Sequence, residues 1–271
     1  MRPVPHFEAP PVREVILTVM FEPVTSLQTL HLAPLRVAWA GEYPKVSEMT
    51  PLPPWRLPLD RAQVEIIGSG SNWPVPLCLL TNSAGDRALQ VQNDRFVVSW
   101  RFDNQAGHYP GYQALLAELR DKFDQLSEVL TQAVGEAPAV GKVEASYRNL
   151  LEGIAPQDLT LGIMTAWQKV DASPIVRDAA YIGFRMHYHP DTTDADVSVL
   201  IGVDPDAGLS TPKENGNTYM SSTFSIEADC AVSVDQEYAE RLTKAHDMLI
   251  SAFLDLTTED MRKAWGGSDE R

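Results

Sequence analysis

The sequence predicts an α+β fold made of two antiparallel-sheet halves, each packed by a long amphipathic helix. Each half of the chain passes through several strand patterns before it reaches one long helix pattern. Turns rich in glycine, proline and aspartate separate the strand patterns. The strict alternation of strands and helices that marks parallel α/β proteins is missing from the pattern. We therefore expect two domains, residues 1–152 and 153–271, with the boundary in residues 153–158.

The N-terminal half begins with a strand pattern and a proline-rich stretch. Residues 13–23, REVILTVMFEP, are rich in β-branched side chains and end in proline, which predicts the first strand. A short helix is expected to begin near Pro34, since proline suits a first helical turn, and to end at Gly41. Prolines then crowd residues 43–73 around the sequence PLPPWRLP. This stretch predicts an extended strap anchored on its own domain by Trp55, or alternatively a polyproline II ligand.

The most regular pattern of the chain is LQVQNDRFVVSWRF, residues 89–102. Apolar and polar residues alternate on both sides of Asn93-Asp94, which predicts a hairpin with one buried face. The side chains expected in the core are Leu89, Val91, Phe96, Val98 and Trp100. The side chains expected to face water or a partner are Gln90, Gln92, Ser99 and Arg101. Arg101 either pairs with a carboxylate or marks a contact surface. Together with Arg95, Trp100 and Trp55 it forms the set of candidate binding residues.

Residues 109–134 carry the clearest helix pattern. Leucine, phenylalanine and valine recur every three or four positions, as on one face of an amphipathic helix. The other face is expected to be solvated and carries Glu118, Arg120, Asp121, Lys122, Asp124 and Glu128. Gly135 and Pro138 form the expected helix end. A strand pattern at residues 140–152 completes the half.

The C-terminal half shows four strand patterns followed by helices. The strand patterns cover residues 159–170, 179–190, 195–205 and 217–232. The second long amphipathic helix is expected at residues 235–256, with His246 at the edge of its apolar stripe. A short helix follows in residues 257–267, with Thr257 or Thr258 as its N-cap.

His187 and His189 are the best candidates for metal ligands. They lie two positions apart on a predicted strand, so both side chains share one face. Asp191 follows in the next turn. Two imidazoles and a carboxylate suit a divalent metal ion, and such a site would indicate a hydrolase or nuclease. In the alternative interpretation, the histidines form the polar side of a half-exposed strand, and the aspartate belongs to its hairpin turn.

The composition narrows the classes of function. With 44% hydrophobic residues, the chain can form a folded core. Its formal net charge of −15, from 22 Lys+Arg and 37 Asp+Glu, repels nucleic acid and anionic membranes and favours a basic protein partner. Cys78 and Cys230 make neither a disulfide framework nor a zinc motif, so reduced buried thiols are expected. Because no apolar signal-peptide core and no apolar stretch of about 20 residues is present, we expect a cytoplasmic protein.

Five segments resemble a sporadically distributed family of uncharacterised bacterial proteins of about this length. The segments are APPVREVILTVMFEP, YPKV with PLPP, LQVQNDRFVVSWR, YPGYQALLAEL and TTEDMRKAWG. Ser99 stands where a common form of the family has asparagine, which weakens any catalytic role at this position. The resemblance implies a bacterial cytoplasmic protein and supplies no catalytic residues. The patchy distribution implies an association with mobile-element, toxin–antitoxin or phage-defence genes.

These observations favour a non-enzymatic acidic protein-binding module without a cofactor. The resembling segments consist of prolines, aromatics and hairpin residues rather than metal-binding or catalytic sets. The expected partner is a basic protein, and the module would act as an antitoxin-like or accessory component of a defence gene pair. The alternative is a metal-dependent hydrolase or nuclease that uses the strand with His187 and His189. A third hypothesis is a sensor that holds a small molecule between a sheet and a long helix. The long helices would pack equally well within one chain or across a homodimer.

Overall fold

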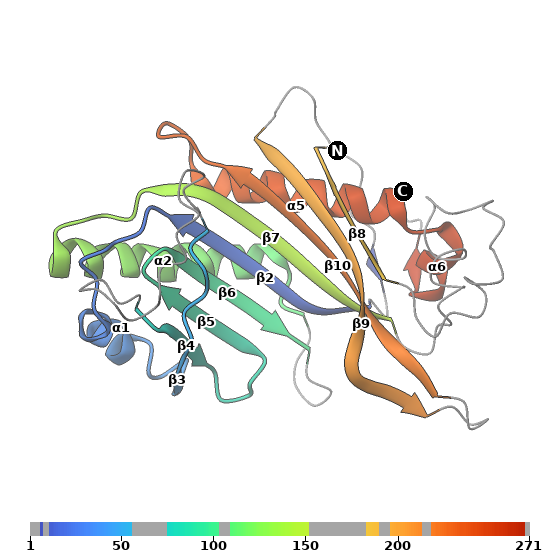
Figure 1. Ribbon diagram of the computed structural model, residues 1–271, viewed down its shortest axis with the longest axis horizontal. Helices are drawn as coiled ribbons and strands as arrows, with labels where there is room; N and C mark the ends of the chain where they lie inside the picture. The colour runs from blue at the N-terminus through green and yellow to red at the C-terminus, as the bar shows by residue number, and fades with distance from the viewer. Residues whose placement is uncertain are drawn as a thin grey trace. The chain divides into compact units, whose positions relative to one another are not determined.

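The computed structural model of the chain describes residues 6–7, 11–55, 75–102, 109–151, 183–189, 196–212 and 218–268. Figure 1 shows the elements. The strands are β1 (His6–Phe7), β2 (Val12–Phe21), β3 (Lys45–Met49), β4 (Leu77–Thr81), β5 (Arg87–Gln92), β6 (Arg95–Arg101), β7 (Val140–Leu151), β8 (Phe184–Tyr188), β9 (Val197–Pro212), β10 (Thr218–Ala231) and β11 (Gly267–Ser268). The helices are the 3-10 helix η1 (Thr29–Leu32), α1 (Ala33–Ala38), α2 (Tyr112–Val134), α5 (Tyr238–Leu256) and α6 (Glu259–Ala264).

The helices begin and end close to the predicted positions. Pro34 lies in the first turn of α1. Gly135 ends α2 in the left-handed conformation, with φ of 77°. Thr258 is the N-cap of α6, and its side chain accepts a hydrogen bond from the Met261 backbone. Among the described residues, no helix combines the length and the apolar character that a membrane crossing requires.

The predicted division into two sheet halves, each packed by a long helix, is wrong. In the described part of the chain, nine strands form one sheet in the order β3-β4-β5-β6-β2-β7-β10-β9-β8, and β1 pairs separately with β11. The long strands β2, β7 and β10 are neighbours in this sheet and link strands from both halves of the sequence. A strand pattern shows which side chains share a face, but it does not show which strand is the neighbour. The pairing of these three strands could therefore not be predicted from their patterns.

The chain divides into two compact units that do not follow its order. Unit 1 comprises residues 1–15, 145–230 and 243–271, and unit 2 comprises residues 16–144 and 231–242. Both β2 and β7 therefore begin in one unit and end in the other. The predicted domain boundary at residues 153–158 lies outside the described residues.

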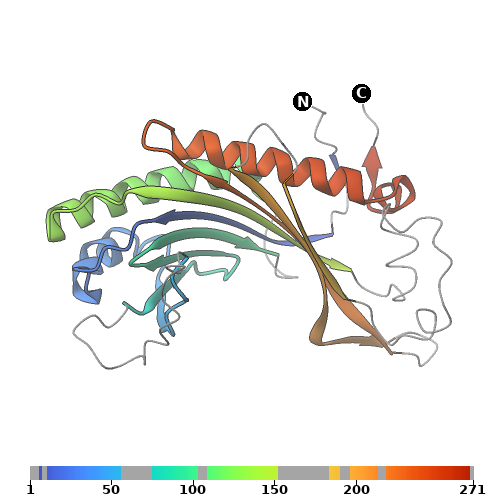
Figure 2. The ribbon, with the colours of Figure 1, turned by 45° about the horizontal axis from the view of Figure 1, so that its top comes forward.

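In unit 2, one face of strands β4 to β6 carries buried core side chains, and β3 continues this face with exposed residues. The antiparallel register aligns two rows of side chains on this face, Val46, Leu80, Leu89 and Val98 in one row and Glu48, Cys78, Val91 and Phe96 in the other. Helix α2 lies along the strands of this unit (Figure 2). Its Phe123 contacts Phe21 and Phe96, with ring centroids 6.0 and 6.1 Å apart.

In unit 1, β8, β9 and β10 form an antiparallel set with one apolar and one polar face. Phe224 on the apolar face stacks on Phe253 of α5, and Phe253 stacks on Trp265 after α6. The polar face carries Arg185, His187, Ser198, Asp204, Glu227 and Asp229. The alternation of both faces follows the two-residue period of the strands.

Gly141 in β7 is a point of close approach in unit 2. A Cβ atom at this position would lie 2.9 Å from Cη2 of Trp55, which is closer than normal contact. The Trp55 ring cannot move away easily, because its Nε1 donates a hydrogen bond to the Phe21 carbonyl at 2.9 Å. The absence of a side chain at Gly141 therefore allows the strap to anchor through Trp55.

We expect Gly141→Ala to lower the free energy of unfolding by about 1–3 kcal/mol, as for other overpacked sites. Gly41→Ala is the matched control, because a Cβ at Gly41 meets nothing within 4 Å. The control should be neutral or stabilising by up to about 1 kcal/mol. Chemical denaturation followed by tryptophan fluorescence measures both variants. Equal stability of the two variants would contradict the close packing of Trp55 on Gly141.

Candidate functional site

Asp94 and Arg95, in the hairpin turn between β5 and β6, are buried together. Only 1% of Asp94 and 9% of Arg95 are exposed. The guanidinium donates to both carboxylate oxygens of Asp94, at 2.9 and 3.0 Å, and to the Pro53 carbonyl. Arg95 therefore holds the turn and the strap together, and it is not an exposed binding residue.

Residues 51–55 of the strap bind the turn end of the hairpin, including Gln92, which was expected to meet water or a partner. Gln92 exchanges two hydrogen bonds with the Leu52 backbone, at 2.8 and 3.0 Å. The backbone N–H of Trp55 donates to Asp94 at 3.3 Å. Gln92 and Ser99 are buried, so the prediction of a single buried face is wrong for these positions. For Gln92 the reason is that Leu52, 40 positions earlier in the chain, supplies the polar partners.

The remaining candidate binding residues occupy different environments. Trp55 anchors the strap, as the sequence predicted. Trp100 is buried and packs on Tyr109, with ring centroids 5.1 Å apart. Arg101 is exposed, and its backbone N–H donates to the Asp86 carbonyl. The structure therefore does not gather Arg95, Trp100, Arg101 and Trp55 into one exposed binding site.

Helix α2 has a polar face that is partly buried, contrary to the prediction of a solvated face. Its Glu118 accepts a hydrogen bond from the Tyr43 hydroxyl and pairs with Arg87 at 2.6 Å. Its Lys122 is buried and donates to Glu42 at 2.8 Å. Tyr43 and Glu42 lie 75 and 80 positions before their partners on α2, which explains why the pattern of the helix alone was misleading.

These contacts fasten the end of α1 to α2. The Trp39 indole donates to Gln125 at 2.7 Å, one turn further along the helix from Lys122. Burial raises the pKa of Tyr43, and the hydrogen bond to Glu118 raises it further, so the hydroxyl stays protonated. Burial lowers the pKa of Lys122, but its hydrogen bonds to Glu42 and Asp121 outweigh this effect and raise it overall. Helix α1 is therefore held at a fixed position over the sheet.

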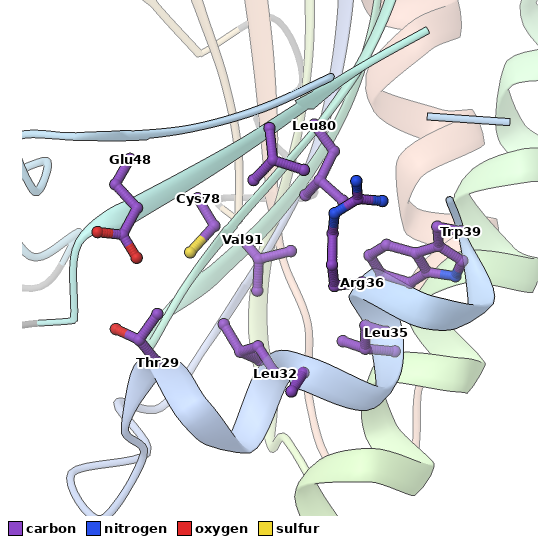
Figure 3. A pocket seen from close by; sticks show the side chains of 11 residues that line it. Thr29, Leu32, Leu35, Arg36, Trp39, Glu48, Cys78, Leu80 and Val91 are labelled. Atoms are coloured by element: carbon purple, nitrogen blue, oxygen red, sulfur yellow. The ribbon is translucent and has the colours of Figure 1, made fainter. Parts of the chain in front are cut away.

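A small apolar pocket lies between this helix and the strands β3, β4 and β5. Figure 3 shows the side chains that line the pocket, and the pocket has a volume of about 160 Å³. The apolar walls are formed by Leu32, Leu35, Trp39, Val46, Leu80 and Val91. The polar side chains at the pocket are Thr29, Arg36, Glu48 and Cys78. Arg36 already donates a hydrogen bond to the Pro44 carbonyl at 3.0 Å.

Cys78 is unsuited to act as a nucleophile at this pocket. Its Sγ is directed into the pocket in Figure 3. Burial raises the pKa of the thiol, and the nearby Glu48 carboxylate raises it further. A reactive cysteine needs the opposite shift, because the thiolate is the nucleophile. The pocket is therefore suited to binding rather than to covalent chemistry.

The segment that builds the pocket is rich in exposed apolar side chains. Five of the seven large apolar side chains exposed among the described residues belong to residues 30–52 and are Leu30, Val37, Val46, Met49 and Leu52. All five residues of β3 are exposed, although they lie in a strand. We call the edge of β3 together with the pocket the β3 surface. The sequence pattern did not reveal this surface, because the prolines of residues 43–73 indicated an extended strap and no strand.

The rings of the metal candidates lie side by side, with His187 on β8 and His189 directly after its last residue. Their ring centroids are 5.3 Å apart. Asp191, the third expected ligand, lies outside the described residues. The described residues contain no group of three or more His, Cys, Asp and Glu side chains arranged to hold a metal ion. A complete catalytic metal centre therefore stays a prediction.

The comparisons with known proteins do not identify the chain. No family model matches it, and no curated protein sequence is significantly similar, so the family resemblance stays an expectation. One similar solved structure is the duplicated taurocyamine kinase from Schistosoma mansoni with bound transition state analog components. The similarity has 10% identity and a TM-score of 0.41, and it covers 90% of this chain and 32% of the kinase chain. A similarity at this level does not indicate a shared fold or activity.

The buried pair of Asp94 and Arg95 predicts a large effect of its disruption. Asp94→Ala leaves the guanidinium buried without its carboxylate, which should cost roughly 3–5 kcal/mol of unfolding free energy. Asp94→Asn keeps an acceptor oxygen and should cost less. Glu128→Ala on the exposed face of α2 is the control and should change stability by less than about 0.5 kcal/mol. Denaturant titration of the unchanged chain and the three variants measures these differences in unfolding free energy. A similar small effect of Asp94→Ala and Glu128→Ala would show that the pair is not structural.

His246 in α5 should make stability depend on pH. Burial lowers the pKa of His246 from its ordinary value of 6.5, although the neighbouring Asp247 partly opposes the shift. At a pH between the lowered pKa of the folded state and the ordinary pKa of the unfolded state, the unfolded chain binds a proton that the folded chain does not bind. The free energy of unfolding therefore falls as the pH drops below about 6.5. We expect His246→Gln to reduce this loss between about pH 7.5 and pH 5, measured by denaturant titration, while His31→Gln keeps it. Identical pH profiles for the wild type and His246→Gln would refute this role.

Proposed function

We propose that this protein is a non-enzymatic protein-binding module that takes up an extended, basic segment of a partner protein at the β3 surface. The observation that carries the proposal is an exposed edge strand beside a preformed apolar pocket. In this mode of recognition, main-chain hydrogen bonds supply affinity and side-chain pockets supply specificity. An antitoxin-like or accessory role in a bacterial gene pair is the biological context that the family resemblance implies.

The position of β3 supports strand addition. It is the first strand in the sheet order and pairs with β4, and no described strand pairs with its other edge. An edge strand presents unpaired backbone N–H and C=O groups, which another extended segment can use. Since β3 is exposed at all five residues, the added strand would not need to displace a described side chain.

The size of the pocket supports an apolar anchor side chain rather than a free small molecule. Sites for drug-sized ligands usually occupy roughly 300–1,000 Å³. An apolar cavity of roughly 150 Å³ accommodates a group of the size of benzene. The pocket, at about 160 Å³, falls in the second class. A leucine, methionine or phenylalanine side chain of the partner would therefore fill it, and the proposed sensor of a larger ligand is less well supported.

The charge at the pocket supports a basic partner. Glu48 points from β3 into the pocket region, and no cation contacts its carboxylate among the described residues. Arg36, the cation of the pocket lining, is engaged with the Pro44 carbonyl. The net charge of −15 acts in the same direction over longer distances. Complementary charge increases the rate of association and excludes acidic competitors.

The proposal is tested with peptides of about ten residues, selected from a displayed random library against the full chain. Selected peptides should carry one large apolar residue and at least one basic residue two positions away, because alternate side chains of a strand share a face. Cys78→Met fills the pocket from its floor, and Val46→Lys places a cation at its mouth. Both variants should weaken peptide binding at least about tenfold, or about 1.4 kcal/mol, in calorimetric titrations.

Val234→Lys is the matched control for the binding experiment. Val234 is as exposed as a valine can be and lies in the turn before α5, away from the β3 surface. The control should bind the peptide with unchanged affinity, and circular dichroism should confirm that all variants remain folded. Peptide affinities that are the same in Cys78→Met, Val46→Lys and Val234→Lys would contradict the proposed site.

A further inference from the structure

The two imidazole rings at the end of β8 have the spacing of ligands to one metal ion. His187 and His189 are exposed, and their ring centroids are 5.3 Å apart with an interplanar angle of 66°. Zinc lies about 2.1 Å from a histidine nitrogen, so a ring centroid lies roughly 3.2 Å from the metal, and two rings at a tetrahedral angle have centroids roughly 5.2 Å apart. The observed separation of the centroids therefore matches the separation expected when both rings bind one ion.

A hydrogen bond to the sheet orients the ring of His189. Its Nδ1 lies 2.9 Å from the backbone carbonyl oxygen of Val197. A carbonyl can only accept, so Nδ1 carries a hydrogen, and in the neutral imidazole this leaves the lone pair on Nε2. Metal-binding histidines commonly donate their second N–H to a carbonyl or carboxylate, which fixes the tautomer and the orientation of the ring. The contact with Val197 therefore engages Nδ1 and leaves Nε2 available to a metal ion.

Carboxylates on the surrounding face of the sheet attract a cation but lie too far from the two histidines to bind the same ion. His187 is aligned with Leu200 and then with Glu227, and Ser198 is aligned with Asp229. These carboxylates lie two strands away, roughly 9–10 Å, so they contribute negative potential rather than ligands. Arg185, which shares the face of β8, pairs with Asp204 at 3.3 Å. Its positive charge is thereby partly compensated.

From this geometry we infer a surface site in unit 1 for one divalent transition-metal ion, held by His187 and His189. Imidazole nitrogen is the preferred ligand of zinc, copper and nickel, whereas calcium and magnesium prefer oxygen. Two protein ligands leave the other coordination positions open to water or to a donor atom of a partner. The site is a binding site and is independent of the β3 surface in unit 2.

The test uses the full chain after treatment with a chelator and dialysis. Calorimetric titration with Zn²⁺ should show one ion per chain, whereas Ca²⁺ and Mg²⁺ should show no comparable binding. With Cu²⁺ in place of Zn²⁺, electron paramagnetic resonance should show hyperfine coupling to two nitrogen nuclei. His187→Ala and His189→Ala should each weaken Zn²⁺ binding at least about tenfold.

His31→Ala is the control, since His31 belongs to η1 in unit 2. Its Zn²⁺ affinity should equal that of the unchanged chain, and circular dichroism should show that each variant is folded. Unchanged Zn²⁺ binding in the folded double variant His187→Ala/His189→Ala would overturn the inference. The absence of stoichiometric Zn²⁺ and Cu²⁺ binding to the unchanged chain would overturn it as well.

Discussion

The buried ion pair of Asp94 and Arg95 is the contact on which the described part of unit 2 most depends. It joins the β5–β6 turn to the strap through the Pro53 carbonyl and the Trp55 backbone. The backbone of the same turn also accepts hydrogen bonds from Phe21 and Val24, next to the end of β2. Because Trp55 then packs against Gly141 of β7, one turn organises segments that are far apart in the sequence. The paired charges tolerate burial because each retains several hydrogen-bond partners.

A second set of buried polar contacts determines where the pocket lies. Glu118, Lys122 and Gln125 follow one another along α2 and bind residues at and after the end of α1. The short helix α1, with only six residues, would not be stable in isolation. Its attachment to α2 keeps it at a distance from the sheet that leaves a small apolar space above Cys78 and Val91. The β3 surface is thus a consequence of packing in unit 2.

Local patterns allowed the elements, but not their partners, to be predicted. The hairpin at Asn93-Asp94, the long helix ending at Gly135 and the capped helix at Thr258 follow from short-range rules. The single sheet could not be predicted, since its central pairs join strands from distant parts of the chain. Burial of Asp94 and Lys122 depends on partners about 40 and 80 positions away. The placement of His187 and His189 on one strand face was predictable, whereas the spacing of their rings required the structure.

The central claim, that an extended segment of a partner adds to β3, is tested most directly by amide hydrogen exchange of the chain with and without a bound peptide. Strand addition should slow the exchange of outward-facing amides within Lys45–Met49, with smaller effects in the residues that line the pocket. Backbone amides of β8, β9 and β10 should exchange at unchanged rates. Protection that appears in unit 1 while β3 remains unprotected would contradict the account.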